Sequence, residues 1–260
     1  MDSIPVKTIL EYAETNGKAT GLVVTSEVTH ATPASFFAHQ KTRYMYEAIA
    51  NDILKSDIEV FIGGGLKYFN DRKDNRDLTQ ILIENDYRLA TNLEELKLIS
   101  NGKVAGLLYE KAPPRYSDGR NEMLTTSTLK ALEILSQREK GFFLLIEGSQ
   151  IDWGGHDNST AYIVEEMIDF DNAIGKVLEF ANKNRNTLVI VTADHETGGM
   201  ALNNGNMETG EVDAQYTSTN HTGVMVPVFA YGPGSEKFRG IYENTAIFEK
   251  MMSAFGFDRK

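Results

Sequence analysis

Cysteine is absent from the 260 residues of this sequence. Disulfides, thiolate zinc sites and cysteine nucleophiles are therefore excluded, and a transition metal could be held only by histidine and carboxylate groups. Histidine is scarce as well, with five residues in all. Four of the five lie in loop-like segments rich in Asp, Thr or Gly. The full set is His30, His39, His156, His195 and His221.

Long apolar runs and an excess of basic residues are also missing. No apolar stretch approaches the length of a membrane span, and no signal-peptide pattern opens the sequence. The formal net charge of −11 argues against a nucleic-acid binder, which needs a basic face. It does not exclude anionic substrates, because bound cations can reverse the local field. We therefore expect no membrane span and no nucleic acid as a specific partner.

Short apolar runs that are typical of buried strands alternate with helical patterns along the chain. This alternation predicts an α/β fold, a mainly parallel, doubly wound sheet with helices on both faces. We expect one helix from Pro33 to about Asp52 and another from about Thr126 to Lys140. No repeat, linker or low-complexity tract interrupts the pattern, so we expect a single domain over residues 1–260. The predicted strands are residues 21–25, 59–65, 104–109, 142–146, 187–192 and 226–231.

Metal-binding residue types follow one of these strands at its carboxyl end, where open α/β sheets bind their ligands. Asp152 and His156 are four residues apart in Glu147-Gly-Ser-Gln-Ile-Asp-Trp-Gly-Gly-His156, so a helical or looped turn can aim both at one ion. His221 could be a third ligand from the loop before the last strand. An Asp/His/His set with an open position suits a catalytic zinc. The alternative is an Asp that caps a helix and histidines that only satisfy loops.

A second strand ends in Ala193-Asp194-His195. Both side chains could reach one ion from the frayed end of the strand. The alternative is a turn that merely needs Gly198 and Gly199, which also permit close backbone approach. We favour a ligand pair at this position.

Three further candidates have strong structural alternatives. Glu147 could be a metal ligand or the partner of an arginine. Thr32 could be a ligand, but it precedes Pro33 and would serve as a helix N-cap. Arg43, on the helix expected after Thr32, could be a solvated charge or a bidentate clamp on a phosphoryl group.

Together these segments resemble the alkaline phosphatase family. Residues 147–156, 192–199 and 221–223 match three family motifs in order, and His30-Ala-Thr-Pro-Ala34 with Arg43 downstream resembles a fourth. The match covers essentially the whole chain. It implies a first zinc, a second zinc, a third site that usually holds magnesium, and an arginine that grips the phosphate. Asp152, His156 and His221 would hold the first zinc, and Asp194 and His195 would hold the second. Thr32 and Glu147 would belong to the third site, and Arg43 would grip the phosphate. His30 and Trp153 occupy adjoining positions where family members differ.

The resemblance implies hydrolysis of phosphate monoesters through a phosphoseryl intermediate. The family's serine nucleophile is not found here, because Asp2-Ser3 is followed by Ile-Pro and preceded by no strand. We therefore expect the larger, C-terminal portion of the family fold, without one central N-terminal strand. The second zinc and magnesium sites would each lack a carboxylate, and turnover by this chain alone would be lost or reduced.

Small phosphomonoesters and inorganic phosphate are the partners that the resemblance implies. Members of the family are typically exported and often dimeric, so we expect a periplasmic or secreted protein and a possible homodimer or other self-association. Two alternatives stay open. One is a non-catalytic zinc- and phosphate-binding fragment or pseudoenzyme. The other is a related phosphodiesterase or phosphomutase, against which the Glu147–His156 motif speaks.

Overall fold

A computed structural model describes residues 4–258 of the chain. Its internal contacts divide these residues into two compact units. The first comprises residues 4–114, 120–147 and 257–258, and the second comprises residues 115–119 and 148–256. The single domain expected from the sequence stays a prediction.

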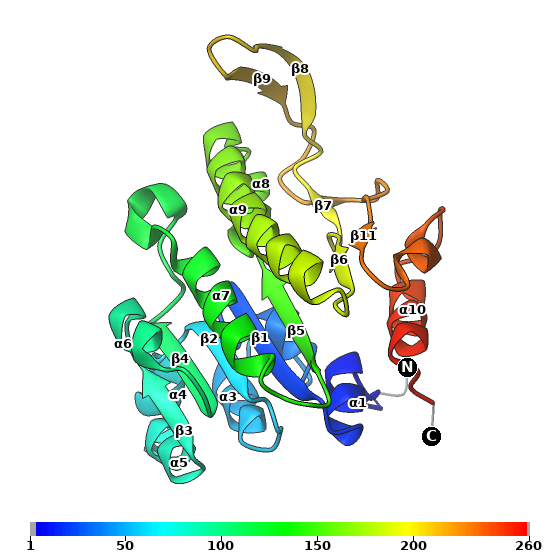
Figure 1. Cartoon of the computed structure of the whole chain (residues 1–260). Coiled ribbons are helices and arrows are strands. Elements are labelled where there is room, and N and C mark those ends of the chain that lie inside the picture. Colours follow the sequence, from blue (N-terminus) through cyan, green and yellow to red (C-terminus); the bar gives the residue numbers. More distant parts are fainter. Residues whose placement is uncertain (1–3, 259–260) are drawn as a thin grey trace. The chain divides into compact units, whose positions relative to one another are not determined.

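The first unit contains a sheet whose strands alternate with helices (Figure 1). Its strands are β1 (Ala19–Glu27), β2 (Val60–Gly64), β3 (Tyr87–Ala90), β4 (Lys103–Tyr109) and β5 (Phe142–Glu147). Its helices are α1 (Ile9–Thr15), α2 (Ala31–Ala34), α3 (Tyr46–Ile53), α4 (Lys67–Asn70), α5 (Leu78–Glu84), α6 (Leu93–Leu98) and α7 (Met123–Leu135), and the helical turn η1 (Tyr116–Arg120) is shared with the second unit.

All five strands of this sheet are parallel, in the order β3-β4-β2-β1-β5. The α/β class and the parallel sheet predicted from the sequence are confirmed. The register brings Leu22 beside Phe61 of β2 and beside Leu145 of β5. β1 therefore has a neighbour on each side and is an interior strand of the sheet, as are β2 and β4.

Helices cover both faces of the sheet, and the alternation of side chains along β1 shows why. Leu22 and Val24 point into the main core, with Leu10 of α1 and Ile49 of α3. Gly21 lies on the opposite face, where a Cβ atom would come within 2.7 Å of Leu135 of α7. The strand is buried along almost its whole length, as expected for parallel strands between two helical layers.

Side-chain caps fix where several of these helices begin. Thr8 accepts a hydrogen bond from the Glu11 amide, and the Glu11 carboxylate accepts one from the Thr8 amide at 2.7 Å. Asp77 caps α5 and Asn92 caps α6 in a similar way. Each cap satisfies an amide that the first helical turn leaves unpaired.

The second unit begins with two helices and continues in short antiparallel strand pairs. The 25-residue α9 is amphipathic, and no helix among residues 4–258 is both long and apolar enough to cross a membrane. The elements are α8 (Gln150–His156), α9 (Thr160–Asn184), β6 (Val189–Val191), β7 (Glu196–Thr197), β8 (Ala201–Asn206), β9 (Glu211–Gln215), β10 (His221–Thr222), β11 (Phe229–Tyr231), η2 (Ser235–Phe238) and α10 (Ala246–Phe255).

The structure corrects three details of the sequence prediction. The helix expected from Pro33 to about Asp52 is interrupted between α2 and α3, so Arg43 lies in a turn and not on a helix. The last two predicted strands are short and form the antiparallel pair β6 and β11. Pro227, which has no amide hydrogen to donate, precedes β11 and explains its late start. Thr32 lies inside α2, whose N-cap is His30, so Thr32 does not cap that helix.

Candidate metal centre

The helix α8 brings Asp152 and His156 to one face, because residues four apart in a helix lie one above the other. Two glycines in the same helix let neighbouring chain segments approach closely. A Cβ atom on Gly154 would lie 3.0 Å from the backbone of Ile163, and one on Gly155 would lie 2.7 Å from the carbonyl of Thr197. The motif therefore packs α8 tightly against β7, which carries Thr197.

The third ligand of the predicted set, His221, comes from β10. Its partner across the antiparallel pair with β7 is Thr197. The Glu196 carboxylate holds the turn beside this pair, since it accepts hydrogen bonds from the amides of Gly199 (3.0 Å) and Met200 (3.1 Å) and from the Thr222 hydroxyl. Gly198 and Gly199 both have positive φ, at 97° and 61°. The glycines and Glu196 together shape the turn that presents His221.

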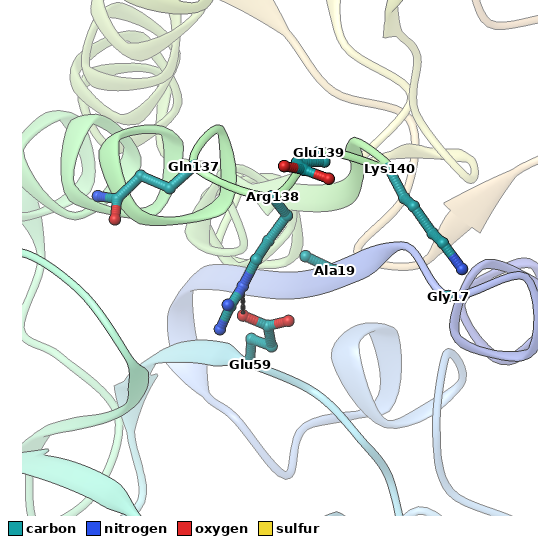
Figure 2. A pocket seen from close by; sticks show the side chains of 7 residues that line it. All are labelled: Gly17, Ala19, Glu59, Gln137, Arg138, Glu139 and Lys140. Atoms are coloured by element: carbon teal, nitrogen blue, oxygen red, sulfur yellow. Dashed lines mark hydrogen bonds and ion pairs between the residues drawn. The ribbon is translucent and has the colours of Figure 1, made fainter.

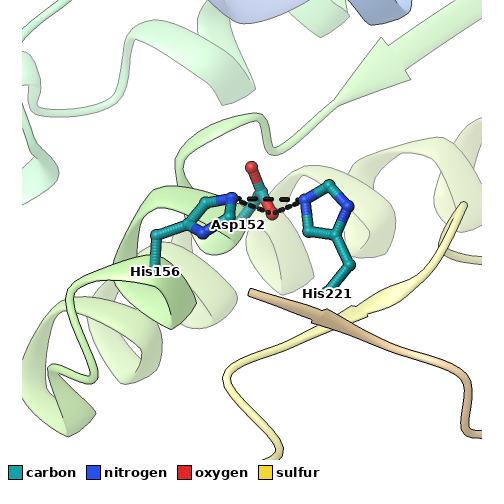
Figure 3. A group of neighbouring side chains, drawn as sticks. All are labelled: Asp152, His156 and His221. Atoms are coloured by element: carbon teal, nitrogen blue, oxygen red, sulfur yellow. Dashed lines mark hydrogen bonds and ion pairs between the residues drawn. The ribbon is translucent and has the colours of Figure 1, made fainter. Parts of the chain in front are cut away.

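Asp152, His156 and His221 converge on one point (Figure 3). The two Nε2 atoms of the histidines are 3.2 Å apart, and each lies 3.5 Å from Oδ1 of Asp152. Ligand atoms about 2.0–2.1 Å from a tetrahedral zinc are about 3.3–3.4 Å from one another. The triangle of donor atoms therefore has the size that zinc requires, with the fourth corner of the tetrahedron open. Among the described residues, this is the one group of three His, Asp or Glu side chains that converges in this way.

Hydrogen bonds outside the triangle orient its members. Nδ1 of His156 lies 2.7 Å from the Thr219 carbonyl oxygen, so this nitrogen carries the proton and donates it. Nε2 of His156 is consequently the unprotonated nitrogen, as a metal ligand must be. The hydroxyl of Thr197 donates to Oδ1 of Asp152 at 2.5 Å. Both candidate ligands are thus held in a fixed orientation by neighbouring groups.

Asp194 and His195 lie in the loop between β6 and β7 and form a second donor pair. Oδ2 of Asp194 is 3.1 Å from Nε2 of His195, again close to the spacing of two ligands on one zinc. The His195 ring stacks on the ring of His221, with centroids 3.5 Å apart and planes 20° from parallel. Nδ1 of His195 lies 3.2 Å from the Thr197 hydroxyl. The pair and the triangle are therefore neighbours in the second unit.

The remaining candidates, apart from Trp153 of the second unit, lie in the first unit. Nη2 of Arg43 lies 3.2 Å from Nε2 of His30, which accepts the hydrogen bond and so holds the guanidinium. Thr32 is in α2 and Glu147 is the last residue of β5. A magnesium site built from Thr32 and Glu147 stays a prediction, as does the role of Arg43 as a phosphate clamp. Trp153 is half-buried on α8, directly after Asp152.

Two hollows in the first unit offer no comparable chemistry. The larger, of about 420 Å³, lies where β1 and β5 begin, at the edge opposite to the carboxyl ends of the strands (Figure 2). Two of its charged side chains pair with each other, since Nε of Arg138 lies 2.7 Å from the Glu59 carboxylate. The second, of about 260 Å³, contains His39, whose Nε2 lies 2.8 Å from Glu11. In neither hollow do the ligand atoms of three described His, Asp or Glu side chains converge on one point.

An α/β scaffold and an Asp/His/His centre with an open fourth position define a metal-binding α/β protein, and comparison with known proteins gives the family. A family model for alkaline phosphatase matches residues 2–213 and 204–257. Alkaline phosphatase 4 of Bacillus subtilis (strain 168) is 37% identical over an alignment 317 positions long, which covers 92% of this chain and 68% of that protein. The chain belongs to the alkaline phosphatase family, a family of phosphomonoesterases that use zinc and magnesium.

Solved structures agree with this assignment. Alkaline phosphatase from the Antarctic bacterium TAB5 superposes with a TM-score of 0.93 at 45% identity, covering 99% of this chain and 78% of that one. A variant of the same enzyme, with one histidine replaced by glutamate, is described with Mg bound in the M3 site; its TM-score is 0.91 at 43% identity. The α/β architecture and the family resemblance predicted from the sequence are thereby confirmed.

Sequence reasoning did not assign a role to Thr197, Glu196 or Gly155. Thr197 and Glu196 lie within a quoted motif, two residues and one residue after His195. A polar side chain so close to a predicted ligand is a signal for a residue that orients it. Gly155 gave no such signal, because its contact is with a strand more than forty residues further along the chain.

Proposed function

We propose that this chain is the zinc-binding part of a phosphomonoesterase, with its first zinc held by Asp152, His156 and His221. The triangle of donor atoms carries this proposal, because its edges of 3.2, 3.5 and 3.5 Å match the ligand spacing of tetrahedral zinc. A surface cluster formed by chance has no reason to direct three donor atoms to one point with that spacing. The hydrogen bonds from His156 to Thr219 and from Thr197 to Asp152 add to the support.

The charge of the ligand set suits an anionic substrate. Two neutral imidazoles and one carboxylate would leave a divalent ion with a net charge of +1, which attracts a phosphate group even though the whole chain carries −11. A bound zinc ion would supply Lewis acidity toward a phosphoryl oxygen at the open position. The Asp152 carboxylate sets the net charge of the centre, and the two histidines set the direction in which its open coordination position points.

The remaining roles are proposed from the family resemblance. Asp194 and His195 would hold a second zinc, and their 3.1 Å spacing supports this. Thr32 and Glu147 would contribute to a magnesium site. Arg43 would bind the non-bridging oxygens of phosphate, with its guanidinium held by His30. Trp153 would adjoin the ligands without binding metal. Location in the periplasm or outside the cell is proposed on the same basis.

For the 260 residues on their own, we propose binding of zinc and phosphate with little turnover. The Thr197 hydroxyl contacts the centre, but it is already engaged with Asp152 and His195. Ser26 is buried and bonds to the Glu27 carbonyl, and Ser3 lies outside the described residues. A non-catalytic zinc- and phosphate-binding fragment is the competing interpretation, and a phosphodiesterase or phosphomutase is a second.

Zinc content tests the metal centre. We expect at least one zinc per chain after dialysis against zinc-free buffer, and loss of that zinc in His156→Ala. The matched control is His39→Ala, which removes a histidine bonded to Glu11 in the other unit and should leave the zinc content unchanged. Equal zinc content in all three proteins would show that the triangle does not bind the metal.

Hydrolysis assays separate the competing functions. We expect slow, zinc-dependent hydrolysis of p-nitrophenyl phosphate in preference to bis(p-nitrophenyl) phosphate, and loss of this residual activity in His156→Ala. Bound zinc and phosphate without any hydrolysis would favour the non-catalytic interpretation. A preference for the diester would favour the phosphodiesterase.

A further inference from the structure

Arg43, the proposed phosphate ligand, lies on an exposed loop. Residues 41–45 immediately precede α3, and all five are exposed. A long side chain on such a loop loses conformational freedom when it binds, and this loss weakens binding unless neighbouring groups already hold the side chain in place. His30 holds the guanidinium, since its Nε2 accepts a hydrogen bond from Nη2 of Arg43 at 3.2 Å. The backbone of the loop needs a separate anchor.

Tyr46, the first residue of α3, is such an anchor. Its half-buried ring stacks on the ring of Tyr68 in α4, with the centroids 4.8 Å apart and the planes 14° from parallel. This separation between nearly parallel rings indicates an offset stack, which is a favourable arrangement. Because Tyr46 follows Arg43 by three residues, the stack fixes the chain close to the arginine.

The Tyr68 ring is itself fixed at the carboxyl end of the parallel sheet. Gly65 follows β2 directly, and Glu27 is the last residue of β1. A Cβ atom on Gly65 would lie 3.4 Å from Cδ2 of Tyr68 and 3.1 Å from Cβ of Glu27. Gly65 has a φ of 99°, which residues with a side chain rarely adopt. The ring therefore lies beside the ends of two interior strands, in a place that glycine leaves open.

Buried Arg72 joins the two helices that carry the stacked rings. Its Nη1 atom donates to the carbonyl oxygen of Glu47 at 2.8 Å and to that of Tyr68 at 2.9 Å. Glu47 is next to Tyr46 in α3, so one guanidinium nitrogen bridges α3 and α4 beside the stack. The start of α3 is thus held at a fixed place relative to Tyr68.

The other anchor of Arg43, His30, is fixed at the same end of the sheet. Its amide donates to the carbonyl of Glu27 at 2.8 Å. The two strands β1 and β2 pair in parallel, so their carboxyl ends lie side by side. Arg43 is therefore held from two directions. His30 holds its side chain, and Tyr46 holds its backbone.

We propose that Tyr46 is a positioning residue for Arg43, and that its stack on Tyr68 keeps the guanidinium in the orientation in which it binds phosphate. This inference rests on the proposed function, because it takes Arg43 as the phosphate ligand. Tyr46 acts through Arg43 and does not itself bind the substrate. The aromatic ring carries the role, since the contact with Tyr68 is between ring faces.

Phosphate binding to the zinc-loaded protein tests this role, with inorganic phosphate as the probe in isothermal titration calorimetry. We expect Arg43→Ala to raise the Kd of phosphate about 10–100-fold, because charge-assisted hydrogen bonds are lost. Tyr46→Leu should raise the Kd about two- to tenfold, since the arginine is still present but must be ordered on binding. Tyr46→Phe keeps the stacked ring and should retain the affinity of the unmodified chain.

A double variant separates positioning from a general loss of structure. If Tyr46 acts through Arg43, Tyr46→Leu should have no further effect on the Kd once Arg43 is alanine. A purely structural role would weaken binding by the same factor with and without the arginine. Tyr12→Leu is the matched control, because Tyr12 is a half-buried tyrosine of α1 in the same unit. It should leave the Kd unchanged, and all variants should retain zinc and native circular dichroism.

The motion of the Arg43 side chain gives a second measurement, which needs no phosphate. NMR relaxation of its Nε–H group yields an order parameter for the phosphate-free protein. We expect a lower order parameter in Tyr46→Leu than in the unmodified chain. Tyr46→Phe and Tyr12→Leu should both match the unmodified chain.

Two results would overturn the positioning role. One is an unchanged order parameter of Arg43 in Tyr46→Leu, and the other is an equal loss of phosphate affinity from Tyr46→Leu with and without Arg43. Either result leaves the proposed function intact. If the unmodified chain bound no phosphate, or Arg43→Ala bound it equally well, the proposed role of Arg43 would be wrong, and an anchor for that role would have no purpose.

Discussion

Oγ1 of Thr197 donates a 2.5 Å hydrogen bond to Oδ1 of Asp152, the oxygen that lies 3.5 Å from Nε2 of both His156 and His221. The same hydroxyl is 3.2 Å from Nδ1 of His195, which donates to it. One side chain therefore orients a ligand in each of the two predicted zinc sites. Thr197 can do so because its strand partner is His221.

Replacing Thr197 by valine should weaken zinc binding. Valine keeps the shape of threonine but has no hydroxyl, so Asp152 loses its donor and His195 loses its acceptor. Loss of a group that orients metal ligands costs about 10–100-fold in affinity. We expect that loss in competition titrations against a chromogenic zinc chelator.

Two further variants make the comparison specific. Thr197→Ser retains the hydroxyl and should restore most of the affinity. Thr160→Val removes a hydroxyl that bonds to Tyr216 in the same unit, at 2.9 Å, and should leave zinc binding unchanged. Equal affinity for Thr197→Val and the unmodified chain would refute the role of this hydroxyl.

Gly155 and Gly175 should respond in opposite ways to alanine, although both lie in helices. A Cβ atom on Gly155 would meet the Thr197 carbonyl at 2.7 Å, and a backbone carbonyl cannot rotate aside. We expect Gly155→Ala to displace β7, to lower the free energy of unfolding by about 1–3 kcal/mol, and to weaken zinc binding. Nothing lies within 4 Å of a Cβ atom on Gly175, so Gly175→Ala should stabilise the protein by about 0.4–1 kcal/mol.

Urea unfolding followed by circular dichroism measures both effects, and the zinc titration described for Thr197 measures the first. If Gly155→Ala raised the free energy of unfolding, α8 and β7 would be able to move apart without any loss of stability. The packing of α8 against β7 would then have no bearing on the metal centre.

The sequence predicted the α/β class, and it placed Asp152 and His156 where one ion could contact both, because each of these predictions depends on local spacing. Alternating apolar runs and helical patterns are visible within short windows, and Asp152 and His156 are one helical turn apart. The antiparallel pairing of β6 with β11 was not predicted, because it depends on which strand lies beside β6 and not on either sequence alone. The role of Thr197 was missed for the same reason, since it follows from the pairing with His221.

The segment around Arg43 shows where a helical pattern misleads. The apolar residues from Phe36 to Ile53 favour one helix. The chain instead leaves α2 in tight turns, in which the Phe36 amide donates a hydrogen bond to the Pro33 carbonyl three residues earlier. The Gln40 side chain then bonds to Asp52 of α3 at 2.6 Å, and residues 41–45 form the loop that leads into this helix. Helix propensity is a weak signal, and these tertiary contacts outweighed it.

Acid should remove the contribution of Asp74 to stability. Asp74 accepts hydrogen bonds from Nε and Nη2 of buried Arg72, at 2.9 and 2.6 Å, and these bonds lower the pKa of its carboxyl group from 3.8 to about 2. A depressed folded-state pKa stabilises the protein above the unfolded pKa, and the stabilisation is lost as the pH falls through the folded pKa. Asp74→Asn should therefore be less stable than the unmodified chain at pH 6.

The measurement is the urea midpoint of both proteins between pH 6 and pH 2. We expect the difference between them to stay constant down to about pH 4 and to shrink between pH 4 and about pH 2, where Asp74 becomes protonated. A difference that does not change across this window would show that the ion pair with Arg72 adds nothing to folding.

Zinc should stabilise the second unit, because its ligands come from two separate elements. Asp152 and His156 lie on α8, whereas His221 lies on β10, so a bound ion joins segments that only the folded chain brings together. A ligand that binds only the folded state adds about 4 kcal/mol to the free energy of unfolding when its free concentration is about 1,000 times its Kd. We expect a zinc-dependent rise in Tm that a chelator reverses. His221→Ala should lose this response, and His39→Ala should retain it, because His39 bonds to Glu11 in the first unit. The same Tm with and without zinc would mean that the folded chain binds the ion no better than the unfolded chain does. The proposed metal centre would then have to be abandoned.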